Sequence, residues 1–311
     1  MTKALGASKP EFRVLKPEEL EPWTEDLRLL ERGITYPIAD GDDRFYIDHG
    51  KTYHRFFSQM GKARFLVAFL QGRAVGFMAG AWKEIQTTDG RRRMALYAGD
   101  LKLDARLRGQ GIVQRMLQYA IGRLTYDADS GGWFIGYAAA MRDATGDVRR
   151  SARGVHLLRL TGQIATLAIY FVPARILVDL PPGGPSAPTG TGLLLSQDPG
   201  PLVESTVGRK DLRLVSSGEH WPLYHLPRAP SRWSEGVGSY LREAATEILG
   251  KREDAIACFC VDERLESHGD WLEKHGLEVG ARCSILALGW PWRVRHITGG
   301  TDWVHISTSE I

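Results

Sequence analysis

Cysteine is scarce, long apolar runs are absent and neither sign of charge dominates in this 311-residue sequence. Cys258, Cys260 and Cys283 are too few for a disulfide framework. No apolar run reaches the about 20 residues that a membrane-spanning helix needs, and residues 1–10 lack the apolar core of a signal peptide. These absences predict a cytoplasmic protein without a membrane partner.

The charge pattern of a nucleic-acid-binding protein is also missing. Lys and Arg number 40 against 37 Asp and Glu, which gives a net charge of +3, and the basic run 91–93 is typical of a solvated turn. No metal is expected, because C-x-C is not a usual zinc spacing and residues 255–261 predict a buried strand that would enclose Cys258 and Cys260. We therefore expect neither nucleic acid nor metal as a partner.

Two familiar phosphate-binding patterns are absent as well. The chain has no GxxxxGK[ST] loop, and the dinucleotide pattern would need a third glycine where Gln114 stands. What the chain does contain is an apolar strand pattern at 94–103, then an Arg-x-x-Gly-x-Gly turn, then an amphipathic helix pattern. The helical spacing is carried by Val113, Met116, Leu117, Ala120, Ile121 and Leu124.

This turn combines the features of an anion site. Gly109 and Gly111 let the backbone approach a ligand, and the first turn of the following helix offers unpaired N–H groups and the positive end of a dipole. Arg106 and Arg108 suit phosphate oxygens. The alternative is a plain strand-to-helix turn with two solvated arginines. The flanking patterns favour a diphosphate cradle, the name used below for residues 106–112.

At Arg106, Gly109 and Gly111 the chain resembles the GNAT superfamily of acyl-CoA N-acyltransferases, whose motif is [Gln/Arg]-x-x-Gly-x-[Gly/Ala]. The resemblance implies acetyl-CoA or a longer acyl-CoA as co-substrate. It implies that the main chains of Leu101 and Leu103 polarise the thioester carbonyl. The residues it assigns to the diphosphate are Arg106, Arg108, Gly109, Gln110, Gly111 and Ile112.

The order of predicted elements agrees with this resemblance. Residues 1–182 contain strand, two helical segments, three strands, helix, strand, helix and strand, and the hairpin at 63–82 argues against a Rossmann-like winding. The resemblance implies an α/β fold with a mixed sheet that splays between its fourth and fifth strands and holds the thioester in the splay. We expect a GNAT acyltransferase domain at 1–182.

A second unit is predicted after a Pro/Gly-rich linker at 183–201. Within 202–311, Gly236 and Gly238 repeat the spacing of the first motif, but Trp233 replaces the arginine and Glu235 brings negative charge. We interpret 202–311 as a truncated, degenerate GNAT-like domain and tail, forming a tandem repeat with a disabled second cradle. Coincidental α/β similarity is the alternative.

The groups that move protons are less well marked than the cradle. The family's helix tyrosine, which protonates the leaving thiolate, is replaced here by Leu158, and Tyr137 and His156 are the candidate substitutes. The alternative for Tyr137 is sheet packing with a satisfied hydroxyl, and the alternative for His156 is a histidine on the surface of a helix. Asp100 and Tyr97 are the candidate bases, on opposite faces of the strand unless it is bulged. A structural hydrogen bond is the alternative for Asp100.

The amine that accepts the acyl group is suggested only by composition. Aspartates gather with aromatic residues and one histidine between the first helices, which predicts either an acidic recess for a cationic amine or, as we favour, turn caps; the cluster comprises Asp40, Asp42, Asp43, Asp48, Tyr36, Tyr46 and His49. The sequence thus predicts an N-acyltransferase acting on an amine of a small molecule or protein, by direct attack on the thioester. The alternative is a non-catalytic acyl-CoA-binding or sensing module. The oligomeric state stays open, a homodimer included.

Overall fold

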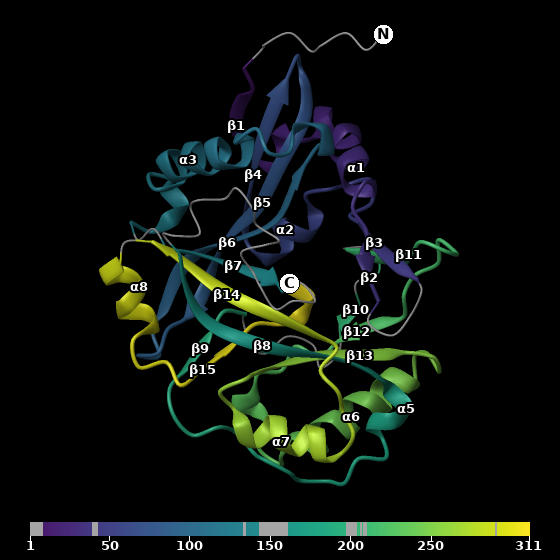
Figure 1. The fold of residues 1–311 in the computed structure, drawn as a ribbon. Helices are drawn as coiled ribbons and strands as arrows, with labels where there is room; N and C mark the ends of the chain where they lie inside the picture. Colours follow the sequence, from purple (N-terminus) through teal and green to yellow (C-terminus); the bar gives the residue numbers. More distant parts are fainter. Residues whose placement is uncertain are drawn as a thin grey trace.

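The computed structural model describes residues 9–38, 43–132, 135–142, 161–196, 204–205, 207, 210–289 and 291–311. Its centre is a mixed sheet of twelve strands. Ten of them follow the order β1-β4-β5-β6-β7-β14-β8-β13-β12-β10, and the other two are β9, which pairs with β5, and β15, which pairs with β9. Helices lie at both ends of the molecule, and the carboxyl-terminal residues lie in its middle (Figure 1). The α/β fold with a mixed sheet is therefore confirmed.

The elements of the amino-terminal half follow the predicted order. They are β1 (Glu11–Leu15), η1 (Pro17–Glu19), η2 (Glu21–Trp23), α1 (Thr24–Arg32), β2 (Tyr36–Pro37), β3 (Arg44–Asp48), α2 (Arg55–Met60), β4 (Lys62–Leu70), β5 (Arg73–Gln86), β6 (Arg92–Leu103), η3 (Ala105–Leu107), α3 (Ile112–Leu124), η4 (Ala128–Ser130), β7 (Ile135–Met141) and β8 (Thr161–Pro173). The predicted helix at 149–161 falls mainly outside the described residues, and His156 and Leu158 lie there.

The remaining elements form the carboxyl-terminal half. They are α5 (Ala174–Leu177), β9 (Gly192–Leu194), β10 (Glu204–Ser205), β11 (Asp211–Leu214), β12 (Leu223–His225), η6 (Pro230–Arg232), α6 (Val237–Leu249), β13 (Ile256–Asp262), α7 (Glu266–Lys274), β14 (Ala281–Gly289), α8 (Pro291–Thr298), β15 (Trp303–His305) and η7 (Thr308–Glu310). Among the described helices, none has the length and apolar character needed to cross a membrane.

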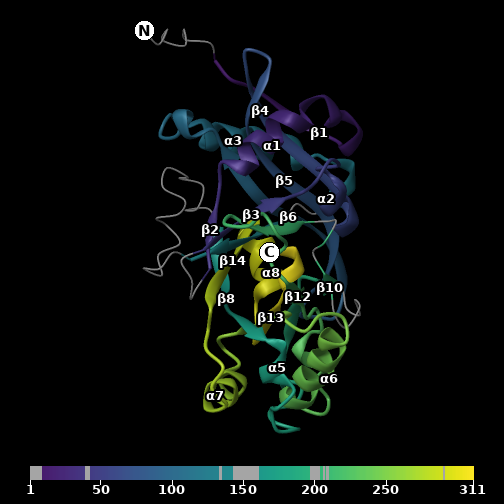
Figure 2. The ribbon, with the colours of Figure 1, turned by 90° about the vertical axis from the view of Figure 1, so that its right-hand side faces the viewer.

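Two details show how the halves join. Strand β8 ends at Pro173, and the chain turns there into α5. Strand β11 belongs to the carboxyl-terminal half but pairs with β3 of the amino-terminal half, in a separate sheet with β2. This small sheet lies beside the central one (Figure 2).

The two halves share one sheet through a reciprocal exchange of strands. In the amino-terminal half β6 and β7 are parallel neighbours, and β14 of the other half pairs with β7 on its far side. In the carboxyl-terminal half β12 and β13 are parallel neighbours, and β8 pairs with β13 in the same position. Strands β14 and β8 then pair with each other at the centre. Each half thus completes its sheet with a strand from the other, so neither half can retain its full sheet alone.

Helix α3 is fixed by apolar contacts on one face of the sheet. Its buried side chains, spaced at helical intervals, join a cluster with residues of β4, β5 and β6, including Leu66 and Trp82; they are Ile112, Met116, Ala120 and Leu124. Met116, Ala120 and Leu124 of the predicted stripe are thus buried on the sheet, whereas Val113, Leu117 and Ile121 are only half-buried. The buried residues hold the start of α3 close to the end of β6.

We predict that the shared sheet unfolds as one cooperative unit. Ile285 of β14 is fully buried and lies opposite Ala139 of β7 and Ala165 of β8. Ile285→Ala should cost about 2–5 kcal/mol of unfolding free energy, because it leaves a cavity where the halves join. Urea unfolding followed by circular dichroism and tryptophan fluorescence should give coincident transitions, both shifted. Val215→Ala, at a side chain 49% exposed, should shift neither. Two separate transitions, with only one displaced by Ile285→Ala, would contradict the shared core.

Candidate active site

Strands β6 and β7 separate after a short stretch of pairing. They pair in parallel through three residues each, 96–98 with 136–138. Beyond that point β6 stays with β5 as far as Leu103, whereas β7 stays with β14 as far as Met141. The facing edges of residues 99–103 and 139–141 therefore diverge, which is the predicted splay. Main-chain N–H and C=O groups along such edges are available to an extended polar ligand.

A β-bulge lies in β6 where the splay opens. The pairing with β5 shifts between Phe77 and Ala79, so that Asp100 and Leu101 together oppose Met78. Asp100 has φ +55°, in the left-handed region that costs a non-glycine residue about 1–2 kcal/mol. The bulge turns Asp100 towards Tyr53, inside the core cluster that also holds Tyr97. Asp100 and Tyr97 thus lie on one face of β6, which the sequence predicted only for a bulged strand.

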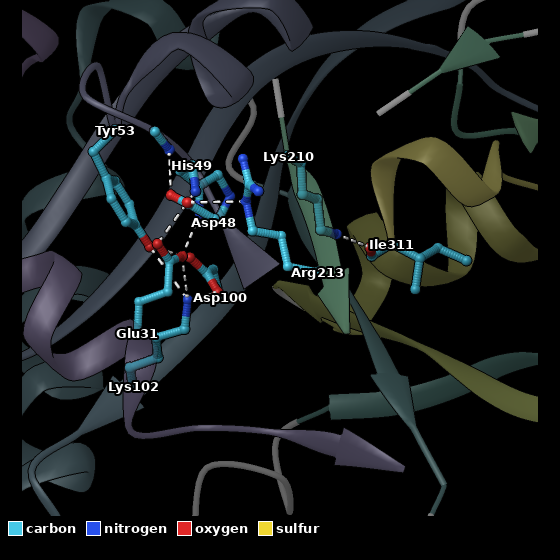
Figure 3. A network of polar contacts seen from close by, with 10 residues as sticks. Glu31, Asp48, His49, Tyr53, Asp100, Lys102, Lys210, Arg213 and Ile311 are labelled. Carbon is cyan, nitrogen blue, oxygen red and sulfur yellow. Dashed lines mark hydrogen bonds and ion pairs between the residues drawn. The ribbon is translucent and has the colours of Figure 1, made fainter. Parts of the chain in front are cut away.

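Behind the bulge lies a buried network of charged side chains (Figure 3). The Lys102 ammonium is 2.6 Å from Asp100 Oδ1 and 3.0 Å from Glu31 Oε1. Tyr53 donates its hydroxyl proton to Asp100 Oδ2. His49 Nδ1 lies 2.5 Å from Glu31 Oε1, and the His49 N–H donates to Glu31 Oε2 at 3.2 Å. The network joins α1, the segment between β3 and α2, and β6.

Asp100 and Lys102 stabilise each other's charged forms in the interior. Burial alone would raise the pKa of Asp100, but the Lys102 ammonium, His49 and the Tyr53 hydroxyl together lower it to about 2. Burial likewise opposes the charged form of Lys102, and Asp100 and Glu31 outweigh it, so the Lys102 pKa is raised. At neutral pH Asp100 is therefore a carboxylate beside the Lys102 ammonium and a weak proton acceptor.

Glu31, His49 and Asp100 could form a metal site by spacing alone, since one ligating atom from each lies within 4.8 Å of the others. However, the Lys102 ammonium already binds both carboxylates. A divalent cation would have to displace this lysine, whose own charge would then be buried without a partner. These residues therefore fit an internal ion pair better than a metal.

The diphosphate cradle has the geometry that the sequence predicts. Gly109 and Gly111 have φ of +78° and +70°, and Gly111 is the N-cap of α3. A Cβ built at either glycine meets no atom within 4 Å, so the loop faces open space. The first N–H groups of α3 point out of its start, as at every helix amino terminus. The backbone there fits an anion such as a diphosphate.

The side chains of the cradle are mostly exposed. Arg106 binds Asp104 at 2.6 Å, and Asp104 also caps η3 by accepting the Arg106 N–H. Arg108 is exposed, and Gln110 donates to the Arg106 carbonyl at 3.2 Å. Ile112 is buried and anchors the helix. Of the two splay residues, Leu101 is 41% exposed and Leu103 packs over Gly76.

Tyr97 and Tyr137 are opposite each other where β6 and β7 still pair, just before the splay. Their rings are 5.4 Å apart, and both side chains are buried. The Tyr137 hydroxyl donates to the Leu195 carbonyl at 3.1 Å. Burial, together with the nearby Glu310 carboxylate, raises the pKa of both tyrosines. For Tyr137 these contacts fit the alternative of sheet packing with a satisfied hydroxyl. The catalytic roles of Tyr97 and Tyr137 stay predictions.

The second cradle is filled by the chain itself. The N–H groups of Val237 and Gly238, at the start of α6, donate to the carbonyls of Pro185 at 2.9 Å and Gly183 at 2.8 Å. A Cβ at Gly236 would lie 2.4 Å from the Gly183 oxygen. Trp233 is buried and stacks on Tyr240 instead of reaching outward. Peptide oxygens from the segment expected to be a linker thus bind the N–H groups that a diphosphate would need.

The aspartates between the first helices act mainly as turn caps where the structure describes them. Asp43 accepts from the Arg44 N–H at 2.7 Å and also binds Ser216. Asp48 accepts from the Gly50 N–H at 2.8 Å. Asp40 and Asp42 lie outside the described residues, whereas Tyr36 stacks on Phe45 and Tyr46 is partly buried. Of the described residues of this cluster, His49 is the one that enters the buried network.

Sequence reasoning missed Glu31, Tyr53 and Lys102. The available signal was Lys102 itself, a lysine inside an apolar strand pattern, which needs a buried partner to be stable. Its partner Glu31 lies 71 positions away in the chain, so no local pattern connects the two.

Solved structures with a similar fold include a tandem GNAT protein and an N-myristoyltransferase. A tandem GNAT protein from the clavulanic acid biosynthesis pathway is 14% identical, with 90% of this chain and 98% of that chain covered and a TM-score of 0.55. N-myristoyltransferase of Saccharomyces cerevisiae with bound myristoyl-CoA is 10% identical, with 93% and 81% covered and a TM-score of 0.50. No protein-family model and no curated protein sequence matches the chain. The chain has the GNAT fold.

We predict that Lys102 is essential to stability. Lys102→Met leaves Asp100 and Glu31 buried without their ammonium, which should cost about 3–5 kcal/mol of unfolding free energy at pH 7. Lys62→Met removes a lysine that pairs with Asp129 at the surface and is 66% exposed, and it should cost little. Urea unfolding of both variants measures the difference.

The pH dependence of the same variant gives a second measurement. In the wild type the Asp100 pKa is about 2, below its value in the unfolded chain. The contribution of Asp100 to the free energy of unfolding therefore persists from neutral pH to about pH 4 and is lost below that. Without Lys102, burial should raise this pKa above the unfolded value. Lys102→Met should therefore recover stability between pH 7 and pH 5, whereas Asp100 gives the wild type no gain there. A pH-independent deficit would contradict the ion-pair account.

Proposed function

We propose that this chain is an N-acyltransferase that moves an acetyl or longer acyl group from acyl-CoA to an amine of a small molecule or protein. The observation that carries the proposal is the combination of the open glycine cradle with the splay that begins a few residues before it. The cradle would hold the diphosphate, and the β6 edge at Leu101 and Leu103 would direct main-chain groups at the thioester. The N-acyltransferases among the structural neighbours support this choice.

The direct test is release of thiol from acetyl-CoA. The full chain is mixed with acetyl-CoA and one of several primary amines: butylamine, phenethylamine, spermidine and a peptide with a free amino terminus. Thiol released in proportion to N-acetylated amine, identified by mass spectrometry, supports acyl transfer. The competing function is an acyl-CoA sensor, which the engaged Asp100 and the buried Tyr97 and Tyr137 favour. Tight CoA binding without thiol release from any amine would select the sensor.

We predict that Gly109→Val lowers CoA affinity at least tenfold. The substitution forces a β-branched residue into a left-handed conformation, which deforms the loop whose backbone should meet the phosphates. Gly90→Val is the matched control, because Gly90 has φ +75°, an equally open Cβ position and a place in the β5–β6 turn. Calorimetric titration with CoA should show weakened binding for Gly109→Val alone. Equal affinity in the two folded variants would refute the cradle.

We also predict one CoA site for each chain. The N–H groups at the start of α6 already bond to peptide carbonyls, including that of Gly183, so no second cradle is open. Calorimetry of the wild type should give a stoichiometry of one, and Gly109→Val should weaken all of the binding. Two equivalents of CoA bound, one of them insensitive to Gly109→Val, would show that the second cradle opens.

A further inference from the structure

His49 has a buried nitrogen without a partner. Its side chain is only 1% exposed, and Nε2 has no hydrogen-bond partner among the residues that the structure describes. The other ring nitrogen, Nδ1, is bound to Glu31 at 2.5 Å. An unsatisfied buried polar atom costs about 1–3 kcal/mol, and the surrounding rings of Tyr53 and Phe56, at 4.6 and 5.6 Å, offer it no strong acceptor or donor.

The partners of Glu31 decide which nitrogen of His49 carries the proton. Glu31 Oε1 receives both His49 Nδ1 and the Lys102 ammonium, so Glu31 is a charged acceptor. Nδ1 must then be the donor, and in the neutral ring Nε2 keeps its lone pair. A carboxylate that holds Nδ1–H in this way fixes the ring and stabilises the imidazolium that forms when Nε2 takes a proton.

His49 lies next to the bulge where the splay begins. One of its ring nitrogens lies within 4.8 Å of an Asp100 carboxylate oxygen, and Asp100 directly precedes Leu101 on β6. Asp100 cannot easily take a proton there, because Lys102 and Tyr53 hold it as a carboxylate. Within the described part of the network, His49 Nε2 is therefore the basic nitrogen that no hydrogen bond occupies.

We propose that His49 accepts the amine proton during acyl transfer and that Glu31 is its positioning residue. This inference rests on the proposed function. As the amine nitrogen forms its bond to the thioester carbon, His49 Nε2 takes a proton from that nitrogen. The C–S bond breaks with its electron pair on sulfur, giving the CoA thiolate and an amide. The Nδ1–H of His49 keeps its proton and its hydrogen bond to Glu31 throughout. No oxidant or reductant is involved.

The test uses His49→Asn in the full chain, with the best amine of the panel. The Asn amide can reach the place of Nδ1 and keep the bond to Glu31, but it provides no basic nitrogen at the place of Nε2. We expect kcat to fall about 100-fold or more while the CoA dissociation constant stays unchanged. His54→Asn is the matched control, because His54 is a partly exposed histidine whose Nδ1 contacts Ser58 at 3.3 Å; it should keep wild-type kcat.

Two further measurements separate a proton acceptor from a structural residue. His49→Ala leaves room in the site, and added imidazole should restore thiol release to it but not to Asp100→Asn. In the Glu31→Gln/His49→Asn double variant kcat should fall no further than in His49→Asn, since Glu31 acts through His49.

The outcomes distinguish this inference from the proposed function. If His49→Asn binds CoA and keeps more than about a third of wild-type kcat, against the factor of 10² or more expected for a general base, His49 is not the acceptor of the proton. If rescue by imidazole appears with Asp100→Asn and not with His49→Ala, Asp100 is the base. If the wild type releases no thiol with any amine, the proposed function fails and this inference fails with it.

Discussion

The position of the Lys102 ammonium between Asp100 and Glu31 is the constraint on which the rest of the site depends. Two carboxylates cannot stay ionised in an apolar core without a cation, and Lys102 is 2.6 and 3.0 Å from them. Because Glu31 comes from α1 and Asp100 from β6, the same lysine attaches the first helix to the strand that opens the splay. The fixed Glu31 carboxylate in turn sets the tautomer of His49.

The reciprocal exchange of β8 and β14 makes each half of the chain necessary for the sheet of the other. Each half supplies the strand that completes the other's sheet, so the carboxyl-terminal half is needed for packing whatever it binds. Its helix start at Val237 and Gly238 is satisfied by peptide carbonyls, which removes the need for an anion there. The loop at Gly109 and Gly111, by contrast, faces open space.

The sequence predicted those features whose determinants are contiguous in the chain. Residues 94–124 contain the strand, the glycine turn and the apolar stripe of α3, and their local patterns suffice for the cradle and its helix. The exchange of β8 and β14 could not be predicted, because an apolar strand pattern does not specify its neighbour. The buried network could not be predicted for a similar reason. Glu31 and Lys102 are isolated charges in the sequence, and only the fold brings them together.

The bulge at Asp100 links the two kinds of feature. A regular β6 would turn Asp100 and Lys102 together to the face opposite Tyr97, away from Glu31 and Tyr53, so the bulge with its φ of +55° at Asp100 is the condition for the buried network. The hydrogen bond from Tyr53 and the ion pair with Lys102 offset that strain. At the same bulge, where Asp100 and Leu101 together oppose Met78, the regular register of β6 with β5 ends, and β6 separates from β7 close to this point. The exposed edge of β6 that we assign to the acyl donor and the buried network that we assign to the amine acceptor therefore both begin at one irregularity in one strand.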